Sequence, residues 1–158
     1  MKKVLIVEDE ILARLGLRQL VDWKKLELEL LPDATDGEEA LEMIRNSCPD
    51  IILLDLNIPK VSGLEILEFL KKEEMPTKVI VVSCQEEFDV VKKAMKLGAY
   101  DYLRKLNLSS DELENILEKC LVETEERITV HMQGIREIRY EEIVRDSRDI
   151  LAGACNYQ

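Results

Sequence analysis

Five short apolar runs, each followed by a segment whose apolar residues have helical spacing, constrain the fold of this chain more than any other feature. The central run is Ile51–Leu54, which is wholly apolar and ends on Asp55. A continuous run of this kind is typical of a parallel strand buried on both faces. Parallel strands that alternate with helices are joined by right-handed crossovers, so the pattern predicts a doubly wound α/β domain with helices on both faces of one sheet. The expected strands are 3–7, 27–31, 51–54, 79–82 and 100–104, and the expected helices are 11–23, 38–46, 64–72, 87–97 and one that begins at 111.

Length and composition set the size and class of the molecule. At 158 residues the chain is long enough for one domain with a proper core and a shorter appendage, but too short for two ordinary domains. Hydrophobic residues make up 46% and charged residues 35%, which is typical of a globular protein rather than a disordered one. No apolar stretch approaches the roughly 20 residues that span a bilayer, and no signal-peptide pattern follows Met1. We therefore expect no membrane segment and a cytoplasmic location.

Charge and cysteine content exclude several functions. The formal net charge of −11 argues against nucleic-acid binding by this chain alone, since that affinity depends on clustered Lys and Arg. The four cysteines are far apart, no CxxC pair is present, and the chain has one His, so neither a zinc site nor a disulfide framework is expected. The cysteines, which we expect to be reduced, are Cys48, Cys84, Cys120 and Cys155.

Polar side chains follow four of the five expected strands, at the point where each strand ends. Glu8 and Asp9 follow the first strand, Asp55 the third, Ser83 the fourth and Lys105 the fifth. Because the carboxyl ends of parallel strands meet at one edge of the sheet, we expect these side chains to lie close together. Carboxylates gathered in this way repel one another unless a cation lies among them, and a hard divalent ion with oxygen ligands fits best.

This arrangement resembles the receiver domain of two-component response regulators, over residues 2 to about 120. The segments 55–59 with Gly63 and 97–103 also match the family's pattern. The segments 20–23 and 36–41 further resemble receivers attached to AraC-type DNA-binding domains. The resemblance implies a flavodoxin-like fold, with a five-stranded parallel sheet in the order 2-1-3-4-5. It also implies a signalling domain that catalyses only its own phosphorylation and dephosphorylation, and is not otherwise an enzyme.

The resemblance assigns a role to each residue at the strand ends. Asp55 would accept a phosphoryl group from a sensor histidine kinase. Glu8, Asp9, Asp55 and the main-chain carbonyl of Asn57 would hold Mg²⁺, and Lys105 would pair with the phosphoryl group or, in its absence, with Asp55. Phosphoryl transfer depends mainly on positioning and on neutralising charge, which these residue types can provide.

The resemblance also implies a conformational switch. Ser83 would donate a hydrogen bond to a phosphoryl oxygen, and Tyr102 in the last strand would follow its movement. The responsive face would run from 87 to 117. A covalent group that interacts differently with two conformers shifts their populations, which is how such a switch would operate.

Two residues depart from the family's usual pattern. Leu106 follows the lysine where proline is usual, so we expect a trans peptide bond there, because a non-proline cis bond costs roughly 2.5 to 4 kcal/mol. Cys84 stands where a smaller residue is usual, and its bulk would narrow access to the phosphoryl group. Gln85 and Asn57 occupy positions that influence the lifetime of the phosphoaspartate in relatives.

The C-terminal segment, 121–158, is expected to be a helical linker or extension of the receiver domain at 1–120. Alternating spacings of four and three residues predict a heptad seam, although polar Thr124 and His131 and the nearby Gly134 weaken it. A parallel coiled coil and a single amphipathic helix folded back on the domain both fit. Candidate surfaces for a homodimer are this helix and the 87–117 face. We expect the chain to be part of a longer regulator with an output domain. The seam consists of Leu117, Leu121, Thr124, Ile128, His131, Ile135 and Ile138.

Two other functions share part of the pattern. A phosphohydrolase of the haloacid dehalogenase type also places a nucleophilic Asp at a strand end, but normally needs an acid two residues later, where this chain has Asn57. A receiver-like module that binds partners without phosphorylation would lack part of the acidic pocket. Neither explains Lys105 and Ser83 together with the acidic pair.

Overall fold

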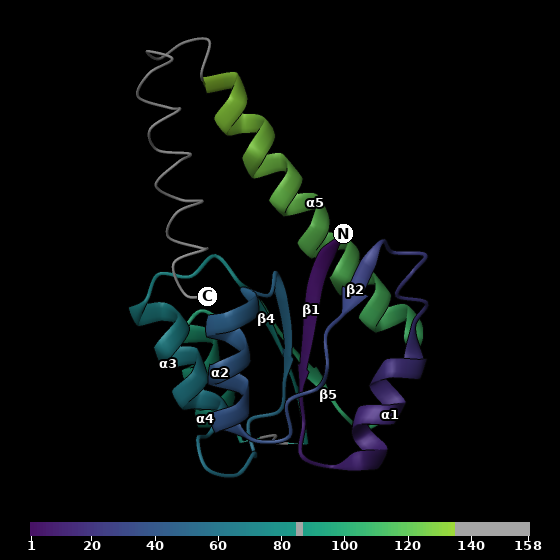
Figure 1. The fold of residues 1–158 in the computed structure, drawn as a ribbon, viewed down its shortest axis with the longest axis vertical. Coiled ribbons are helices and arrows are strands. Elements are labelled where there is room, and N and C mark those ends of the chain that lie inside the picture. Colours follow the sequence, from purple (N-terminus) through teal and green to yellow (C-terminus); the bar gives the residue numbers. More distant parts are fainter. Residues whose placement is uncertain (85–86, 135–158) are drawn as a thin grey trace.

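The computed structural model describes residues 1–84 and 87–134, with side chains as far as 123. Within this part, the chain forms a five-stranded, wholly parallel sheet in the order β2-β1-β3-β4-β5, which confirms the predicted fold (Figure 1). Strands and helices alternate along the chain, as the sequence pattern predicts. The elements are β1 Lys2–Val7, α1 Ile11–Leu20, β2 Leu28–Leu30, α2 Gly37–Ser47, β3 Ile51–Leu54, α3 Gly63–Lys72, β4 Lys78–Ser83, α4 Phe88–Lys96, β5 Asp101–Arg104 and α5 Ser110–Gly134.

Helices cover both faces of the sheet, so that its apolar strands are buried from two sides. Helices α2, α3 and α4 lie on one face, and α1 and α5 lie on the other (Figure 1). Every residue of β3 is buried, which explains why this strand is apolar without alternation. Alternate residues of the neighbouring strands enter the two cores. Leu5, Val7, Val79 and Val81 face α2 to α4, whereas Val4, Ile6, Ile80 and Val82 face α1 and α5.

Side-chain caps fix where several helices begin. Asp36 accepts a hydrogen bond from the Glu39 amide at 2.8 Å and caps the start of α2. Ser62 and Glu65 form a reciprocal capping box at α3. Ser109 accepts from the Glu112 amide at 3.1 Å where α5 begins. These local contacts position the helices relative to the strand ends that precede them.

The first helix is shorter than the sequence pattern predicts. We expected it to reach Trp23, but α1 ends at Leu20 because Val21 adopts an extended backbone, with φ −126° and ψ 161°. Trp23 still lies in the core, and its indole N–H donates to the carbonyl of Arg18 at 3.1 Å. The apolar periodicity therefore continues past the helix end because a turn, rather than a further helical turn, brings Trp23 into the core.

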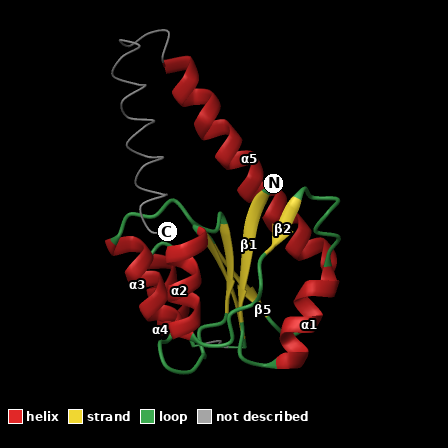
Figure 2. Cartoon of the chain, viewed as in Figure 1, coloured by secondary structure: helices red, strands yellow, loops and turns green. Residues whose placement is uncertain are grey.

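The strand register brings the carboxyl ends of the strands to one edge of the sheet, at the bottom of Figure 2. Leu54 of β3 pairs with Val7 of β1 and with Val81 of β4, so the residues that follow Val7 and Leu54 are level with each other. Ser83 pairs with Arg104 of β5. The ends of these four strands therefore bring together the polar residues that the sequence places there.

Helix α5 is much longer than the other helices and extends past the amino ends of the strands, away from the edge just described (Figure 1). It is continuous through the predicted domain boundary at 120 and is helical as far as Gly134. The part of the predicted extension after Gly134, which includes Ile135 and Ile138, lies outside the described residues. None of the helices in the described part combines the length and the apolar character that crossing a membrane requires.

Candidate functional site

Three carboxylates converge at the carboxyl ends of β1 and β3. Glu8, Asp9 and Asp55 each offer an oxygen, and these oxygens lie within 4.8 Å of one another. Asp55 is held level with the end of β1 because its amide donates to the carbonyl of Val7 at 3.0 Å. Glu8 and Asp55 are 1% and 6% exposed, whereas Asp9 is exposed to solvent. The cluster therefore has a buried floor and an open side.

Lys105 joins two of these carboxylates. Its ammonium Nζ donates to Oε1 of Glu8 at 2.8 Å and to Oδ2 of Asp55 at 3.1 Å. Its own amide donates to the carbonyl of Ser83 at 3.1 Å, which extends the β4–β5 pairing by one residue and fixes the base of the side chain. The following bond to Leu106 is trans, as are the other peptide bonds of the described residues, which confirms the expectation for this departure from the family pattern. Lys105 reaches the carboxylates without the usual proline after it.

The site leaves negative charge only partly compensated. Burial, with a smaller contribution from Asp55, raises the pKa of Glu8 to about 7, and this value already includes the opposing effect of Lys105. Burial alone would lower the pKa of Lys105, but its hydrogen bonds to Glu8 and Asp55 outweigh that effect and raise it. Oε2 of Glu8 is buried and has no hydrogen-bond partner in the described part of the structure. A buried carboxylate oxygen without a partner carries a substantial desolvation cost.

These features fit a hard divalent cation. A second positive charge beside Glu8 and Asp55 would offset their repulsion and give the unpartnered Oε2 a ligand role. All three acidic residues offer oxygen, the donor that Mg²⁺ prefers, and exposed Asp9 leaves room for the water molecules that Mg²⁺ retains. Asn57 lies two residues after Asp55, and its amide donates to Oδ1 of Asp55 at 3.2 Å. The residues present therefore suit the predicted Mg²⁺ site.

The loop that follows Asp55 is packed tightly against two glycines. A Cβ atom on Gly63 would lie 2.8 Å from the carbonyl oxygen of Asp55 and 2.6 Å from the Cα of Leu56. A Cβ on Gly37 would lie 1.9 Å from the carbonyl oxygen of Val61, and the Gly37 amide donates to the carbonyl of Pro59 at 3.0 Å. Both positions exclude any side chain. The absence of side chains there lets α2 and α3 hold the main chain around Asp55.

The two residues of the predicted switch lie on the same face of the sheet. Tyr102 pairs with Val81, and Ser83 lies two residues beyond Val81 on the same strand. The side chains of β4 and β5 alternate, so Ser83 and Tyr102 both face α4. Ser83 is fully buried and Tyr102 is half-buried at the edge of this core. The sheet therefore places Tyr102 on the same face as Ser83 rather than on the opposite one.

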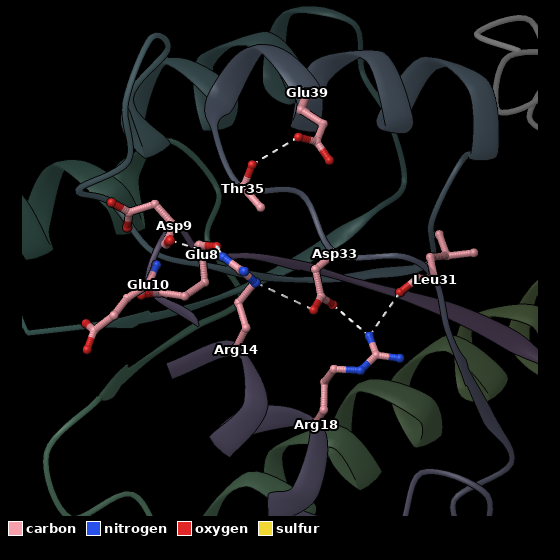
Figure 3. Close-up of polar contacts among 9 residues, drawn as sticks. All are labelled: Glu8, Asp9, Glu10, Arg14, Arg18, Leu31, Asp33, Thr35 and Glu39. Atoms are coloured by element: carbon pink, nitrogen blue, oxygen red, sulfur yellow. Dashed lines mark hydrogen bonds and ion pairs between the residues drawn. The ribbon is translucent and has the colours of Figure 1, made fainter. Parts of the chain in front are cut away.

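One group of residues around the site was not anticipated from the sequence. Arg14 of α1 reaches back to the main chain of the acidic pair and towards Asp33, which follows β2 (Figure 3). Arg18 also pairs with Asp33. An arginine one turn into the helix that follows an acidic pair is a signal that could have suggested this contact, but the position of Asp33 depends on how the chain folds.

Comparison with known proteins defines the family. The chain matches the model of the response regulator receiver domain over residues 4–118 and belongs to this family, whose members serve two-component signalling systems. The match covers all of the five strands except the first two residues of β1, and it includes the whole edge at which the site lies.

Relatives agree with this assignment. An uncharacterized response regulatory protein of Staphylococcus epidermidis is 34% identical over 118 residues, which are 75% of this chain and 46% of that protein. The uncharacterized transcriptional regulatory protein YesN of Bacillus subtilis is 30% identical over 141 residues, which are 89% of this chain and 38% of YesN. The chain therefore spans less than half the length of these relatives. The receiver domain of AraT, a response regulator of Geobacillus stearothermophilus, has a TM-score of 0.72 and 31% identity, over 80% of this chain and 97% of that domain.

Proposed function

We propose that this chain is the phosphoacceptor domain of a signalling pathway and that Asp55 accepts a phosphoryl group from a phosphohistidine of a sensor kinase. One observation carries the proposal: buried Asp55 lies among Glu8, Asp9 and Lys105, a set that combines a nucleophilic carboxylate with groups that can hold and neutralise a phosphoryl group. The location at the carboxyl ends of the strands is where ligands bind in this type of fold. Family membership supports the same role.

In the proposed reaction, a carboxylate oxygen of Asp55 attacks the phosphorus of the donor. A bond forms between that oxygen and phosphorus while the bond between phosphorus and the imidazole nitrogen breaks, and its electron pair stays on the imidazole. Lys105 can pair with a phosphoryl oxygen, since its ammonium lies 3.1 Å from Asp55 Oδ2 and has a third hydrogen beyond the two that it donates to Glu8 and Asp55. The Asn57 amide, 3.2 Å from Asp55 Oδ1, restrains the carboxylate for in-line attack.

Glu8, Asp9, Asp55 and the main-chain carbonyl of Asn57 would hold Mg²⁺. When bound, Mg²⁺ supplies positive charge that offsets the charge on the oxygens of the transferred group. The carboxylate of Glu8 is held in place because its Oε1 accepts a hydrogen bond of 2.8 Å from Lys105 Nζ. Asp9 is exposed, so the cluster is open to solvent on the side of Asp9, and a phosphoryl donor would approach Asp55 from this side.

After transfer, Ser83 would donate a hydrogen bond to a phosphoryl oxygen, and Tyr102 would follow it. The support is positional: the two side chains share the face of the sheet that α4 covers, and Ser83 is buried beside Lys105 along the strand edge. A hydrogen bond that exists only in the phosphorylated form favours one of two conformers. The 87–117 face would differ between the two conformers. This face and the C-terminal helix are the candidate surfaces for a homodimer.

Exposed apolar side chains beside the site favour a protein as the donor. Ile11, Leu12 and Leu15 of α1 are 63%, 76% and 48% exposed, and Leu106 after β5 is 68% exposed. Since α1 follows β1 and Leu106 follows β5, these side chains lie on both sides of β3 and Asp55. An apolar surface that borders a reacting carboxylate suits a docking kinase, which must bring its phosphohistidine to Asp55.

The regulated output is transcription, through a DNA-binding domain of AraC type in a longer protein. One relative that aligns with most of this chain is named a transcriptional regulatory protein, and the chain spans 38% of its length. The net charge of −11 supports a separate domain for DNA binding. We expect the protein to act in the cytoplasm and to catalyse no reaction beyond its own phosphorylation and dephosphorylation.

The test is the intact mass of the protein after incubation with acetyl phosphate and Mg²⁺. We expect the gain of one phosphoryl group, and its loss in Asp55→Asn or with a chelator. Asn57→Asp is a matched variant two residues away that retains Asp55, and it should still gain the group. Absence of any adduct on folded protein would overturn the proposal and favour a receiver-like module that binds partners without phosphorylation. Release of phosphate from small phosphate esters would instead favour a phosphohydrolase.

A further inference from the structure

Arg14 contacts the main chain of the acidic pair rather than its carboxylates. Its terminal nitrogen Nη1 donates to the carbonyl oxygen of Glu8 at 3.0 Å and to that of Asp9 at 3.0 Å (Figure 3). This nitrogen carries two hydrogens, and the two contacts use both. The carboxylates of Glu8 and Asp9 stay available for other partners. Arg14 therefore fixes the backbone that carries the acidic pair while leaving their ligand oxygens free.

Arg14 is itself held by a second segment of the chain. Its Nε lies 3.9 Å from Oδ2 of Asp33, and Asp33 accepts a hydrogen bond of 2.7 Å from Arg18. Arg14 and Asp33 are 17% and 15% exposed at their side chains, so the pair is largely sheltered from water. The segment around Asp33 is fixed along β1, because the Glu8 amide donates to the carbonyl of Ala34 at 3.0 Å. Arg14 thus ties the acidic loop to a rigid neighbour.

Such a restraint is needed because the carboxylates of the cluster repel one another. Oxygens of Glu8, Asp9 and Asp55 lie within 4.8 Å, and Lys105 compensates only Glu8 and Asp55. Without a restraint, the loop that carries exposed Asp9 would relax away from the other two. Holding its main chain keeps the ligand oxygens together before a cation arrives, which lowers the cost of binding.

We propose that Arg14 is a positioning residue that pre-arranges Glu8 and Asp9 for Mg²⁺. This inference rests on the proposed function of the acidic cluster as a Mg²⁺ site. Arg14 acts through its hydrogen bonds to two carbonyl oxygens and not through its charge. Loss of the hydrogen bonds and loss of the charge would change the affinity for Mg²⁺ in opposite directions. A positive charge close to a cation site weakens cation binding, so removal of charge alone would tighten the binding of Mg²⁺. Loss of a positioning contact weakens it.

The experiment compares Arg14→Gln with Arg18→Gln in the full chain by calorimetric titration with Mg²⁺ alone. The two arginines share helix α1 and the partner Asp33, but only Arg14 contacts the acidic loop. We expect the dissociation constant of Mg²⁺ to rise about tenfold in Arg14→Gln, as for loss of a group that orients metal ligands. For Arg18→Gln we expect it to stay within about twofold of the wild type. Unchanged or tighter binding in Arg14→Gln, or equal weakening in both variants, would overturn the proposal.

Amide hydrogen exchange without metal provides a second measurement. Exchange at residues 8–10 should be several-fold faster in Arg14→Gln, while the β3 amides should exchange as in the wild type. If Arg14→Gln does not fold, Arg14→Lys replaces it, because a lysine keeps the charge but cannot reach both carbonyls and Asp33 in the same geometry. Unchanged exchange at residues 8–10 would overturn the positioning role. Failure of the wild type to bind Mg²⁺ would instead overturn the proposed function, whatever the variants do.

Discussion

Glu8 lies in an environment that disfavours its charged form when no cation is bound. Its side chain is buried beside Asp55, one of its oxygens is unpartnered, and Lys105 compensates only the other. A pKa raised from 4.5 to about 7 means that the folded protein binds a proton at Glu8 more tightly than the unfolded chain does. The stabilisation due to that proton is complete below about pH 4.5 and is lost as the pH rises through about 7.

We therefore predict that Glu8→Gln stabilises the protein in the absence of divalent cations. Glutamine has nearly the same shape but no charge, so the desolvation and repulsion at neutral pH disappear. The expected gain in the free energy of unfolding is on the order of 1 to 3 kcal/mol at neutral pH and close to zero at about pH 4.5. Urea unfolding in a chelator at several pH values measures it. Exposed Glu10→Gln serves as the control, and an equal gain in both variants would contradict the argument.

The cysteines provide a second prediction at the level of single residues. Cys120 is 1% exposed, and burial raises the pKa of its thiol to about 12, whereas Cys84 is exposed. Since the thiolate is the reactive form, iodoacetamide at about pH 8 should alkylate Cys84 in the native protein and Cys120 only after unfolding. Peptide mapping by mass spectrometry checks this. Rapid alkylation of Cys120 in folded protein would mean that α5 does not pack on the sheet as described.

At the scale of elements, the turn that follows helix α3 contains a residue unsuited to its backbone conformation. Glu74 has φ 51°, in the left-handed region that favours glycine. We predict that Glu74→Gly raises the free energy of unfolding by about 0.5 to 1 kcal/mol, because glycine adopts this conformation without strain. Denaturant unfolding measures the change. Glu68→Gly, at an exposed position inside α3, should lower stability by about 1 kcal/mol, and a gain there would contradict the helix assignment.

The contact between α3 and the strand end supports a prediction about both stability and chemistry. Gly63→Ala should lower the free energy of unfolding by about 2 to 4 kcal/mol, because a Cβ would lie 2.6 Å from the Cα of Leu56. The same clash would displace Asp55, whose carbonyl would lie 2.8 Å from that Cβ, so phosphorylation by acetyl phosphate should slow in the folded fraction. Gly16→Ala in α1 has nothing within 4 Å and should stabilise slightly. Equal effects at the two glycines would refute the packing argument.

The elements show which parts of the molecule a sequence can predict. The strands were predictable because burial on both faces demands unbroken apolar runs such as Ile51–Leu54, and the site residues because strand ends share an edge. The end of α1 was predicted wrongly, since Trp23 is buried through a turn that apolar spacing cannot distinguish from a helix. The contact of Arg14 with Asp33 could not be predicted, because it joins helix α1 to the loop after β2, and their relative position depends on the strand register.

For the whole molecule, folding and cation binding should be coupled. The acidic cluster exists only in the folded state, because its residues come from strand ends far apart in the sequence. Mg²⁺ at a concentration about 100 times its dissociation constant should therefore raise the free energy of unfolding by about 2.7 kcal/mol. Thermal or urea unfolding with Mg²⁺ and with a chelator measures this. Asp55→Asn should reduce the effect, and a shift that persists undiminished in that variant would place the cation elsewhere.

Helix α5 begins five residues after Lys105 in the sequence and extends past the opposite edge of the sheet. The described end of α5, at Gly134, therefore lies on the far side of the domain from the carboxylates. A change at Asp55 must therefore be transmitted along the length of the strands to reach the surface around the described end of α5. Because the two ends of the domain share no residues, the sequence at the described end of α5 can vary without altering any contact within the carboxylate cluster.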